Sequence, residues 1–193
     1  MNTTRTAVTA VASLLTLGLA GCSSPTPGTP EPTNGGETTS AANDPFQIGQ
    51  PKNLKAVSEP CQLLTPQQLQ QLGATTEGKP AQAQWGQTNC AWDNEQLTLQ
   101  VSPDTVQGQG IRYIAKIAGD DNGNPTAKID GYPAVHEGKS SGSCGTYVGV
   151  SDKEMVLVHF GVGSEGRSNP EFTDPCATAD KIAGMVISNL PPA

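Results

Sequence analysis

Four cysteines constrain the fold of this 193-residue chain more than any other feature. They stand at positions 61, 90, 144 and 176, and no two form the Cys-x-x-Cys spacing that is typical of zinc sites and thioredoxin-like redox sites. In an exported protein, an even number of widely spaced cysteines indicates disulfides. We therefore expect two disulfides, and four cysteines can form them in three ways.

The N-terminus indicates export. Residues 7–20 carry no charge, and this stretch is too short to span a bilayer, so it suits the apolar region of a signal peptide. It ends in Leu-Ala-Gly-Cys at residues 19–22, a run that resembles the bacterial lipobox. We therefore expect residues 1–21 to be a lipoprotein signal peptide and the Cys22 thiol to carry the lipid. The alternative is a plain secretory signal with a chance cysteine.

The segment after Cys22 has the composition of a disordered tether. Residues 23–45 contain no Val, Ile, Leu, Met or aromatic residue, and 16 of these 23 positions are Ser, Thr, Pro or Gly. Such a stretch buries too little apolar surface to offset the entropy lost on ordering. We expect a lipidated cysteine and tether over residues 22–59 and one folded domain over residues 60–193.

Composition and charge exclude nucleic acid as a partner. The formal net charge is −7 and only 4% of residues are aromatic. Nucleic-acid binding needs a basic surface to neutralise phosphates and, for single strands, aromatic platforms on which bases stack. The hydrophobic fraction of 35% is also below the roughly 45–50% of ordinary globular chains, which indicates a small core.

The sequence predicts three helices. Thr65 is a typical N-cap, Pro66 suits the first helical position, and Gln68 can close a capping box. Gly73 then ends this first helix. The other two helices are expected at residues 110–117, with Gly119 as the cap, and from Pro175 to Leu190.

About six strands are expected. Leu97, Leu99 and Val101 alternate with polar residues, which is typical of a half-buried strand. Asp130 and Gly131 form the strongest two-residue hairpin turn in the chain. The six expected strands are residues 89–92, 97–101, 126–129, 132–136, 144–150 and 155–161. Tight hairpins imply antiparallel pairing, so we predict an α+β fold with helices on one or both faces of the sheet.

These elements favour a sequential pairing of the cysteines. Cys61 precedes the first helix and Cys90 begins a strand, so a short loop can bring them together. Cys144 opens a strand, and Cys176 lies in the first turn of the last helix, which must pack across the sheet. We favour Cys61–Cys90 and Cys144–Cys176; a Cys61–Cys176 bridge would instead place two helices side by side.

The ordered motifs resemble one family. Pro60-Cys61 leads into a helix that ends in Leu-Gly, Cys90-Ala91-Trp92 follows, Cys144 begins a strand, and Asp174-Pro175-Cys176 heads the last helix. Over about residues 55–193 this arrangement is similar to that of the actinobacterial lipoproteins of the DUF3558 family. The resemblance implies an envelope lipoprotein whose domain carries disulfides, and it brings no catalytic residues.

Three loop motifs partly match known catalytic, calcium-binding or phosphate-binding patterns. Residues 138–142 match the Gly-x-Ser-x-Gly pattern of hydrolases, but the sequence after them predicts a strand instead of the required helix. Residues 120–124 have the acidic character of a calcium loop but lack glycine at the sixth position. Residues 161–170 form a glycine-rich loop without the ending of a phosphate-binding loop. We expect the first to be a hairpin loop and the second a polar turn. The third is a long loop, for which the rim of a ligand site is the alternative.

The histidines and tryptophans are the remaining candidates. His136 and His159 lie in expected strands, and alternation places His159 on the face opposite Val158 and Phe160. A zinc site needs more ligands than these two provide. The tryptophans at 85 and 92 could cap a cleft, although the second is better suited to the core beside Cys90.

The sequence therefore predicts no catalytic residue, cofactor or metal site. The expected function is a lipid-anchored, non-enzymatic binding or interaction module on the outer face of the plasma membrane. Its partners would be the membrane, through Cys22, and an envelope protein or ligand. The alternatives are a hydrolase of envelope polymers and a carrier of a hydrophobic molecule, which would need a large apolar cavity.

Overall fold

The computed structural model describes residues 44–193. The expected signal peptide, Cys22 and residues 22–43 of the expected tether lie outside the described residues. None of the helices in residues 44–193 combines the length and the apolar character needed to cross a membrane.

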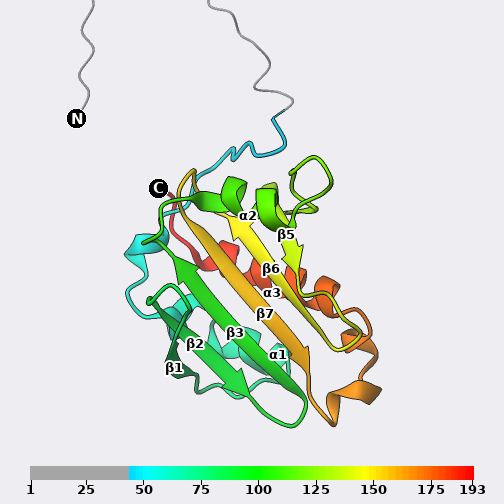
Figure 1. Cartoon of the computed structure of the whole chain (residues 1–193). Coiled ribbons are helices and arrows are strands. Elements are labelled where there is room, and N and C mark those ends of the chain that lie inside the picture. The colour runs from blue at the N-terminus through cyan, green and yellow to red at the C-terminus, as the bar shows by residue number, and fades with distance from the viewer. Residues whose placement is uncertain (1–43) are drawn as a thin grey trace, which may run out of the picture. The chain divides into compact units, whose positions relative to one another are not determined.

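One seven-stranded antiparallel sheet forms the centre of the domain, in the order β1-β2-β3-β7-β6-β5-β4 (Figure 1). It consists of two meanders, β1–β3 and β4–β7, which meet where β3 pairs with β7. The strands are β1 (Lys79–Gln82), β2 (Thr88–Asp93), β3 (Leu97–Asp104), β4 (Ala127–Ile129), β5 (Tyr132–Glu137), β6 (Ser143–Gly149) and β7 (Met155–Val162). The predicted α+β class and antiparallel pairing are confirmed.

The strand β1 was not among the six that the sequence predicted. All four residues of β1 are exposed, and Pro80 lies at its centre. Apolar alternation, the pattern by which the other strands were found, is therefore missing here. A short edge strand that contains proline also resists pairing with another chain.

Three α-helices lie where the capping residues predict. In α1 (Pro66–Gln71), Thr65 and Gln68 form the expected capping box. In α3 (Pro175–Asn189), the Asp174 carboxylate accepts hydrogen bonds from the first turn. Helix α2 (Gly110–Ala118) connects β3 to the far edge of the sheet. Short 3₁₀ turns complete the fold: η2 (Leu54–Ala56), η3 (Pro60–Leu63), η4 (Gly166–Ser168) and η5 (Pro170–Phe172).

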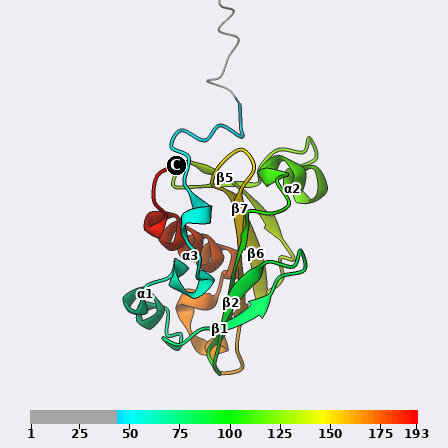
Figure 2. The ribbon, with the colours of Figure 1, turned by 90° about the vertical axis from the view of Figure 1, so that its left-hand side faces the viewer.

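The two faces of the sheet are covered differently (Figure 2). Helices α1 and α3 and the turn η3 pack on one face, which we call the covered face. Its core includes Trp92, Val158 and Phe160 from the strands and Ile182 and Val186 from α3. On the other face, which we call the open face, α2 packs over β5 and β6 in a second, small apolar cluster.

Two disulfides tie covering elements to the covered face. Cys61 in η3 is joined to Cys90 in β2, and Cys144 in β6 is joined to Cys176 in the first turn of α3. This is the sequential pairing that the sequence favours. The bridges close loops with sequence separations of 29 and 32 residues, so each is worth roughly 3–4 kcal/mol in the chain-entropy account.

The expected start of the domain at residue 60 is wrong. Leu54 is buried in the main core, and Ile48 and Val57 pack against it. The Lys52 backbone N–H donates to the Val150 carbonyl at 2.9 Å. The low apolar content of residues 23–45 does not extend to residues 46–57, and these apolar side chains are sufficient to hold the segment on the domain.

The same segment also holds the C-terminus. The Asn53 N–H donates to the Pro191 carbonyl at 2.9 Å, and the Ala193 N–H donates to the Pro51 carbonyl at 3.0 Å. The Tyr132 hydroxyl donates to the Gln50 carbonyl at 2.6 Å. The domain therefore begins by residue 44, and its N-terminal segment (residues 44–57) is part of its structure.

Candidate functional site

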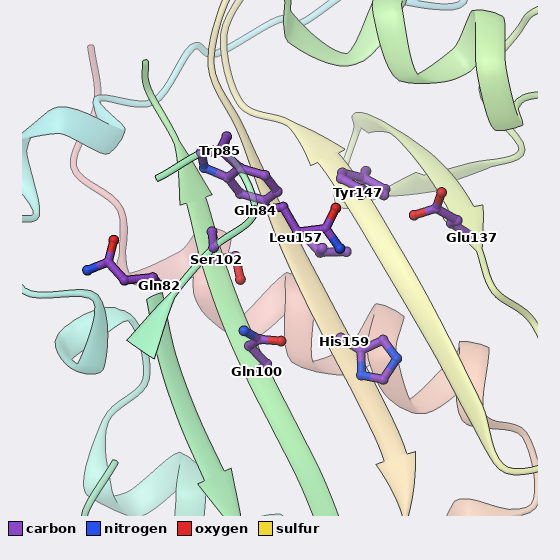
Figure 3. Close-up of a pocket in the computed structure, with 10 residues that line it drawn as sticks. Gln82, Gln84, Trp85, Gln100, Ser102, Glu137, Tyr147, Leu157 and His159 are labelled. Atoms are coloured by element: carbon purple, nitrogen blue, oxygen red, sulfur yellow. The ribbon is translucent and has the colours of Figure 1, made fainter. Parts of the chain in front are cut away.

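A groove of about 410 Å³ lies on the open face, beside the part of the sheet that α2 covers (Figure 3). Side chains of the central strands form its floor, and the β1–β2 loop and β5 border it. It is lined by Gln82, Ala83, Gln84, Trp85, Gln100, Ser102, Glu137, Tyr147, Leu157 and His159. We refer to it as the groove.

The pleat of the sheet sets the floor of the groove. In one row across the strands, Gln100 of β3 pairs with His159 of β7, which pairs with Gly145 of β6. Gly145 has no side chain; a Cβ there would lie 3.4 Å from Leu157 Cδ1 and 3.9 Å from the His159 ring. Atoms of the neighbouring strands therefore already surround this glycine, and the floor of the groove is formed by the side chains of Gln100, Leu157 and His159.

Two half-buried aromatic side chains stand at the sides of the groove. The Trp85 indole N–H donates to the Pro103 carbonyl at 3.0 Å. This hydrogen bond holds the indole ring, which comes from the β1–β2 loop, over β3. Tyr147 rises from β6, and Leu157 of β7 lies between the two rings (Figure 3). Because each ring is only partly covered by protein, apolar surface remains for a ligand.

The groove continues toward α2. A second depression of about 240 Å³ shares Gln84, Trp85 and Tyr147 with it and extends to Ile114 and Met155. The two depressions follow β7 along the open face. The site is therefore elongated.

The groove carries little charge. Glu137 is its only lining residue with a carboxylate, and no Lys or Arg lines it. Burial, together with the neighbouring Glu137 and Asp104 carboxylates, raises the pKa of the Tyr147 phenol. The phenol thus remains protonated at neutral pH and can donate a hydrogen bond.

The two histidines lie on opposite faces of the sheet. His159 lines the groove, and the predicted alternation with Val158 and Phe160 is confirmed because both of those residues are buried. On the covered face, His136 Nε2 lies 2.8 Å from Asp180 Oδ1, and the Thr146 hydroxyl donates to the same oxygen at 2.8 Å. These contacts link α3 to the sheet. Within residues 44–193, no three His, Cys, Asp or Glu side chains are placed to hold a metal ion.

The two tryptophans have different roles. Trp92 is 1% exposed and belongs to the main core, as the sequence favours. Gly78 packs so closely on it that a Cβ would lie 2.7 Å from the indole and 2.3 Å from Cys90 Sγ. Trp85 is the one that lines the groove.

The loop motifs lie elsewhere. Residues 138–142 connect β5 to β6, and the Ser140 hydroxyl accepts from the Ser143 N–H at 3.0 Å, so the segment is the expected hairpin loop. Asp120 accepts hydrogen bonds from Asn122 and Asn124 in a polar turn, which lowers its pKa. The glycine-rich loop contributes Arg167 to a separate depression that Phe172 also lines.

A comparison with protein families shows to which family the chain belongs. Residues 17–189 match the sequence profile described as "Protein of unknown function (DUF3558)". The chain belongs to the DUF3558 family. The resemblance noted from the cysteine motifs is therefore correct at the level of the family. The chain matches no curated protein and no solved structure.

In this DUF3558 domain, sequence reasoning singled out only two residues of the groove, Trp85 and His159. The glutamines and Tyr147 were missed because each is an ordinary polar or aromatic residue of a strand or loop. The alternation on β3 and β7 places Gln100 and Leu157 on one face. The alternation does not show that β3 and β7 are neighbours in the sheet. The floor of the groove could not be predicted because it depends on this pairing.

Proposed function

We propose that the chain is a lipid-anchored, extracytoplasmic binding domain of the cell envelope that is not an enzyme and holds its ligand in the groove. The observation that carries this proposal is the groove itself. It combines partly exposed aromatic rings with amide side chains, on a sheet made rigid by antiparallel pairing and two disulfides. Binding sites commonly join apolar surface to a few polar groups in this way.

The arrangement of titratable side chains favours binding over catalysis. Glu137 and His159 both line the groove, but β6 lies between their strands. Two strand spacings separate their backbones by roughly 10 Å. Glu137 is also the only carboxylate of the lining, whereas hydrolysis of a glycosidic bond commonly uses a pair of carboxyl groups. A hydrolase of envelope polymers is therefore the weaker proposal.

The lining of the groove also disfavours a carrier of hydrophobic molecules. Such a carrier needs an enclosed apolar cavity that removes most of the ligand from water. The groove is an open depression whose floor includes Gln100, Ser102 and His159. These polar side chains would lose hydrogen bonds to water if a hydrocarbon covered them.

The lipobox-like run at residues 19–22 supports the anchor and the location. Lipid on Cys22 would attach the chain to the membrane, and residues 23–43 would separate the bilayer from the domain. The groove would then face envelope components close to the membrane.

Two experiments test this proposal. Metabolic labelling with a fatty acid should mark the wild-type chain and not Cys22→Ala; equal labelling of both would refute the anchor. For the groove, a photo-reactive amino acid is placed at Gln84 and, as a control, at Gln70, an exposed residue of α1.

The crosslinking experiment is carried out on native cell envelopes. We expect one envelope component to be captured at position 84, not at position 70, and to be lost when Trp85→Ala is added. Mass spectrometry then identifies its chemical class. Equal capture at both positions, or capture that persists without Trp85, would refute binding in the groove.

A further inference from the structure

We infer that the ligand of the groove is a neutral carbohydrate chain built of pyranose rings with equatorial hydroxyls. The inference deepens the proposed function and rests on it. It is drawn from the kinds of side chain that line the groove, their exposure and the lack of cationic groups.

The aromatic rings match the flat faces of such a sugar. A pyranose with equatorial hydroxyls exposes axial C–H groups on its two faces and hydroxyls around its rim. Aromatic rings offer a large, rigid apolar surface against which C–H groups pack. Trp85 and Tyr147 present two such surfaces, and the hydrogen bond to Pro103 fixes the first before a ligand binds.

The polar side chains match the hydroxyl rim. A sugar hydroxyl both donates and accepts a hydrogen bond. An amide side chain also does both, as does a serine hydroxyl. Gln82, Gln84, Gln100 and Ser102 provide four such groups around the groove. A ligand with only donors or only acceptors would leave part of this set unpaired.

The charge of the site excludes acidic ligands. Glu137 is the one residue with a carboxylate among the lining residues. Phosphate and carboxylate groups are usually bound by Arg, Lys or a cluster of backbone N–H groups. The lining has no Arg or Lys, so a polymer that carries phosphates or uronates would meet repulsion from Glu137.

The position of the groove favours a sugar over an extended peptide. Peptides that bind to sheets usually add a strand at an edge and pair with free main-chain groups. The groove lies over β3, β7 and β6, which are interior strands with a partner on each side. The main-chain groups of these strands are already paired, so a ligand can contact only their side chains. A carbohydrate can bind through side chains alone.

The shape of the site favours a chain over a single ring. The second depression shares Trp85 and Tyr147 with the groove and extends it toward Ile114. Adjacent rings of a linear oligosaccharide could occupy the two depressions along β7. Affinity should therefore increase with chain length until both are filled.

The test uses the exported, lipidated chain in a detergent without a sugar headgroup. Isothermal titration calorimetry measures the binding of cellohexaose, chitohexaose and maltohexaose, with hexagalacturonate as the acidic comparator. We expect at least one of the first two to bind more tightly than its disaccharide and than hexagalacturonate. Acrylamide quenching of Trp85 fluorescence should decrease on binding, whereas buried Trp92 should contribute little change.

Variants locate the binding site. Trp85→Ala should weaken binding at least tenfold, and Gln100→Ala at least threefold. Tyr113→Ala removes an aromatic side chain on α2 that is 43% exposed and does not line the groove, so it should leave binding unchanged. Unfolding curves establish whether each variant is folded. If Trp85→Ala does not fold, the binding of Gln100→Ala still decides the test.

Each outcome has a defined meaning. Failure of every neutral hexasaccharide to bind at millimolar concentration, preference for hexagalacturonate, or binding that ignores both groove variants would overturn the inference. If position 84 then still captures a peptide or lipid in a Trp85-dependent manner, the binding function stands and only the carbohydrate class falls. If that capture also fails, the proposed function falls with it.

Discussion

Phe160 and His159 are neighbours on β7 but face opposite sides of the sheet. Phe160 is fully buried on the covered face, where its ring contacts Phe172 at a centroid distance of 5.1 Å. His159 is exposed and lines the groove. The same alternation separates Cys144, in a disulfide, from Gly145, beside the groove. One set of strands thus supplies both the side chains of the main core and the side chains that line the groove.

This difference shows how a domain with a small core can leave part of a sheet uncovered. Both disulfides and most apolar side chains lie with the covered face. The open face contributes less to burial, so its residues can vary in chemistry at little cost to folding. The following predictions test this division.

The largest expected effect separates the two neighbours on β7. Phe160→Ala should lower the free energy of unfolding by about 3–5 kcal/mol, because it leaves a cavity in the core. His159→Ala should change it by no more than about 0.5 kcal/mol. Urea unfolding monitored by circular dichroism measures both. Similar losses for the two variants would show that the open face also carries the fold.

Loss of a disulfide should be nearly as costly. The paired variant Cys144→Ser with Cys176→Ser should lose about 3–4 kcal/mol, because its unfolded chain is no longer constrained. The paired variant of Cys61 and Cys90 should lose a similar amount, since its loop is of similar length. Denaturant unfolding of the two variants checks this, and a loss below 1 kcal/mol in either would contradict the entropic account.

A buried amide offers a stabilising change. Asn89 in β2 is completely buried, and neither polar atom of its side chain has a hydrogen-bond partner among residues 44–193. Such a group costs about 1–3 kcal/mol, so Asn89→Leu should raise the free energy of unfolding by about 1 kcal/mol. Thermal unfolding measures the change. A lower stability would mean that ordered water pairs with the amide.

The smallest expected effect concerns the Tyr147 phenol and occurs only at alkaline pH. Because the fold raises the pKa of Tyr147, the folded state holds its proton above the pH at which the unfolded chain releases it, about 10. The stability from this group is complete below that pH and falls as pH rises toward the folded pKa. Above about pH 10, the free energy of unfolding of Tyr147→Phe should therefore fall less steeply with pH than that of the wild type. Equal alkaline slopes for wild type and variant would contradict this.

Local chemistry made much of the fold predictable. Thr65 and Gln68 specify the start of α1, and Asp130 and Gly131 both have the positive φ angles, 48° and 89°, that their hairpin turn requires. Apolar alternation on β3 and β7 reveals which side chains are buried. In each case the deciding interaction lies within a few residues of sequence.

Long-range pairing accounts for most of what was not predicted. Nothing in the sequence of β3 or β7 specifies that Gln100 lies opposite His159, because many registers satisfy the same alternation. Likewise, the local sequence does not show that Leu54 enters the core, since its contacts are distant in sequence. The groove depends on such pairings, so only two of its residues were recognised in advance.

The N-terminal segment has a mechanical consequence. Any pull on the chain before residue 44 acts first on residues 44–57, which are held by separate hydrogen bonds to Val150, Pro191 and Tyr132. Peeling can proceed only as far as Cys61, where the covalent bond to Cys90 in β2 takes the load. We expect the released residues to add roughly 60 Å of extension before the sheet itself is strained. The first disulfide thus removes residues 62–89, which include the β1–β2 loop of the groove, from the path of that pull.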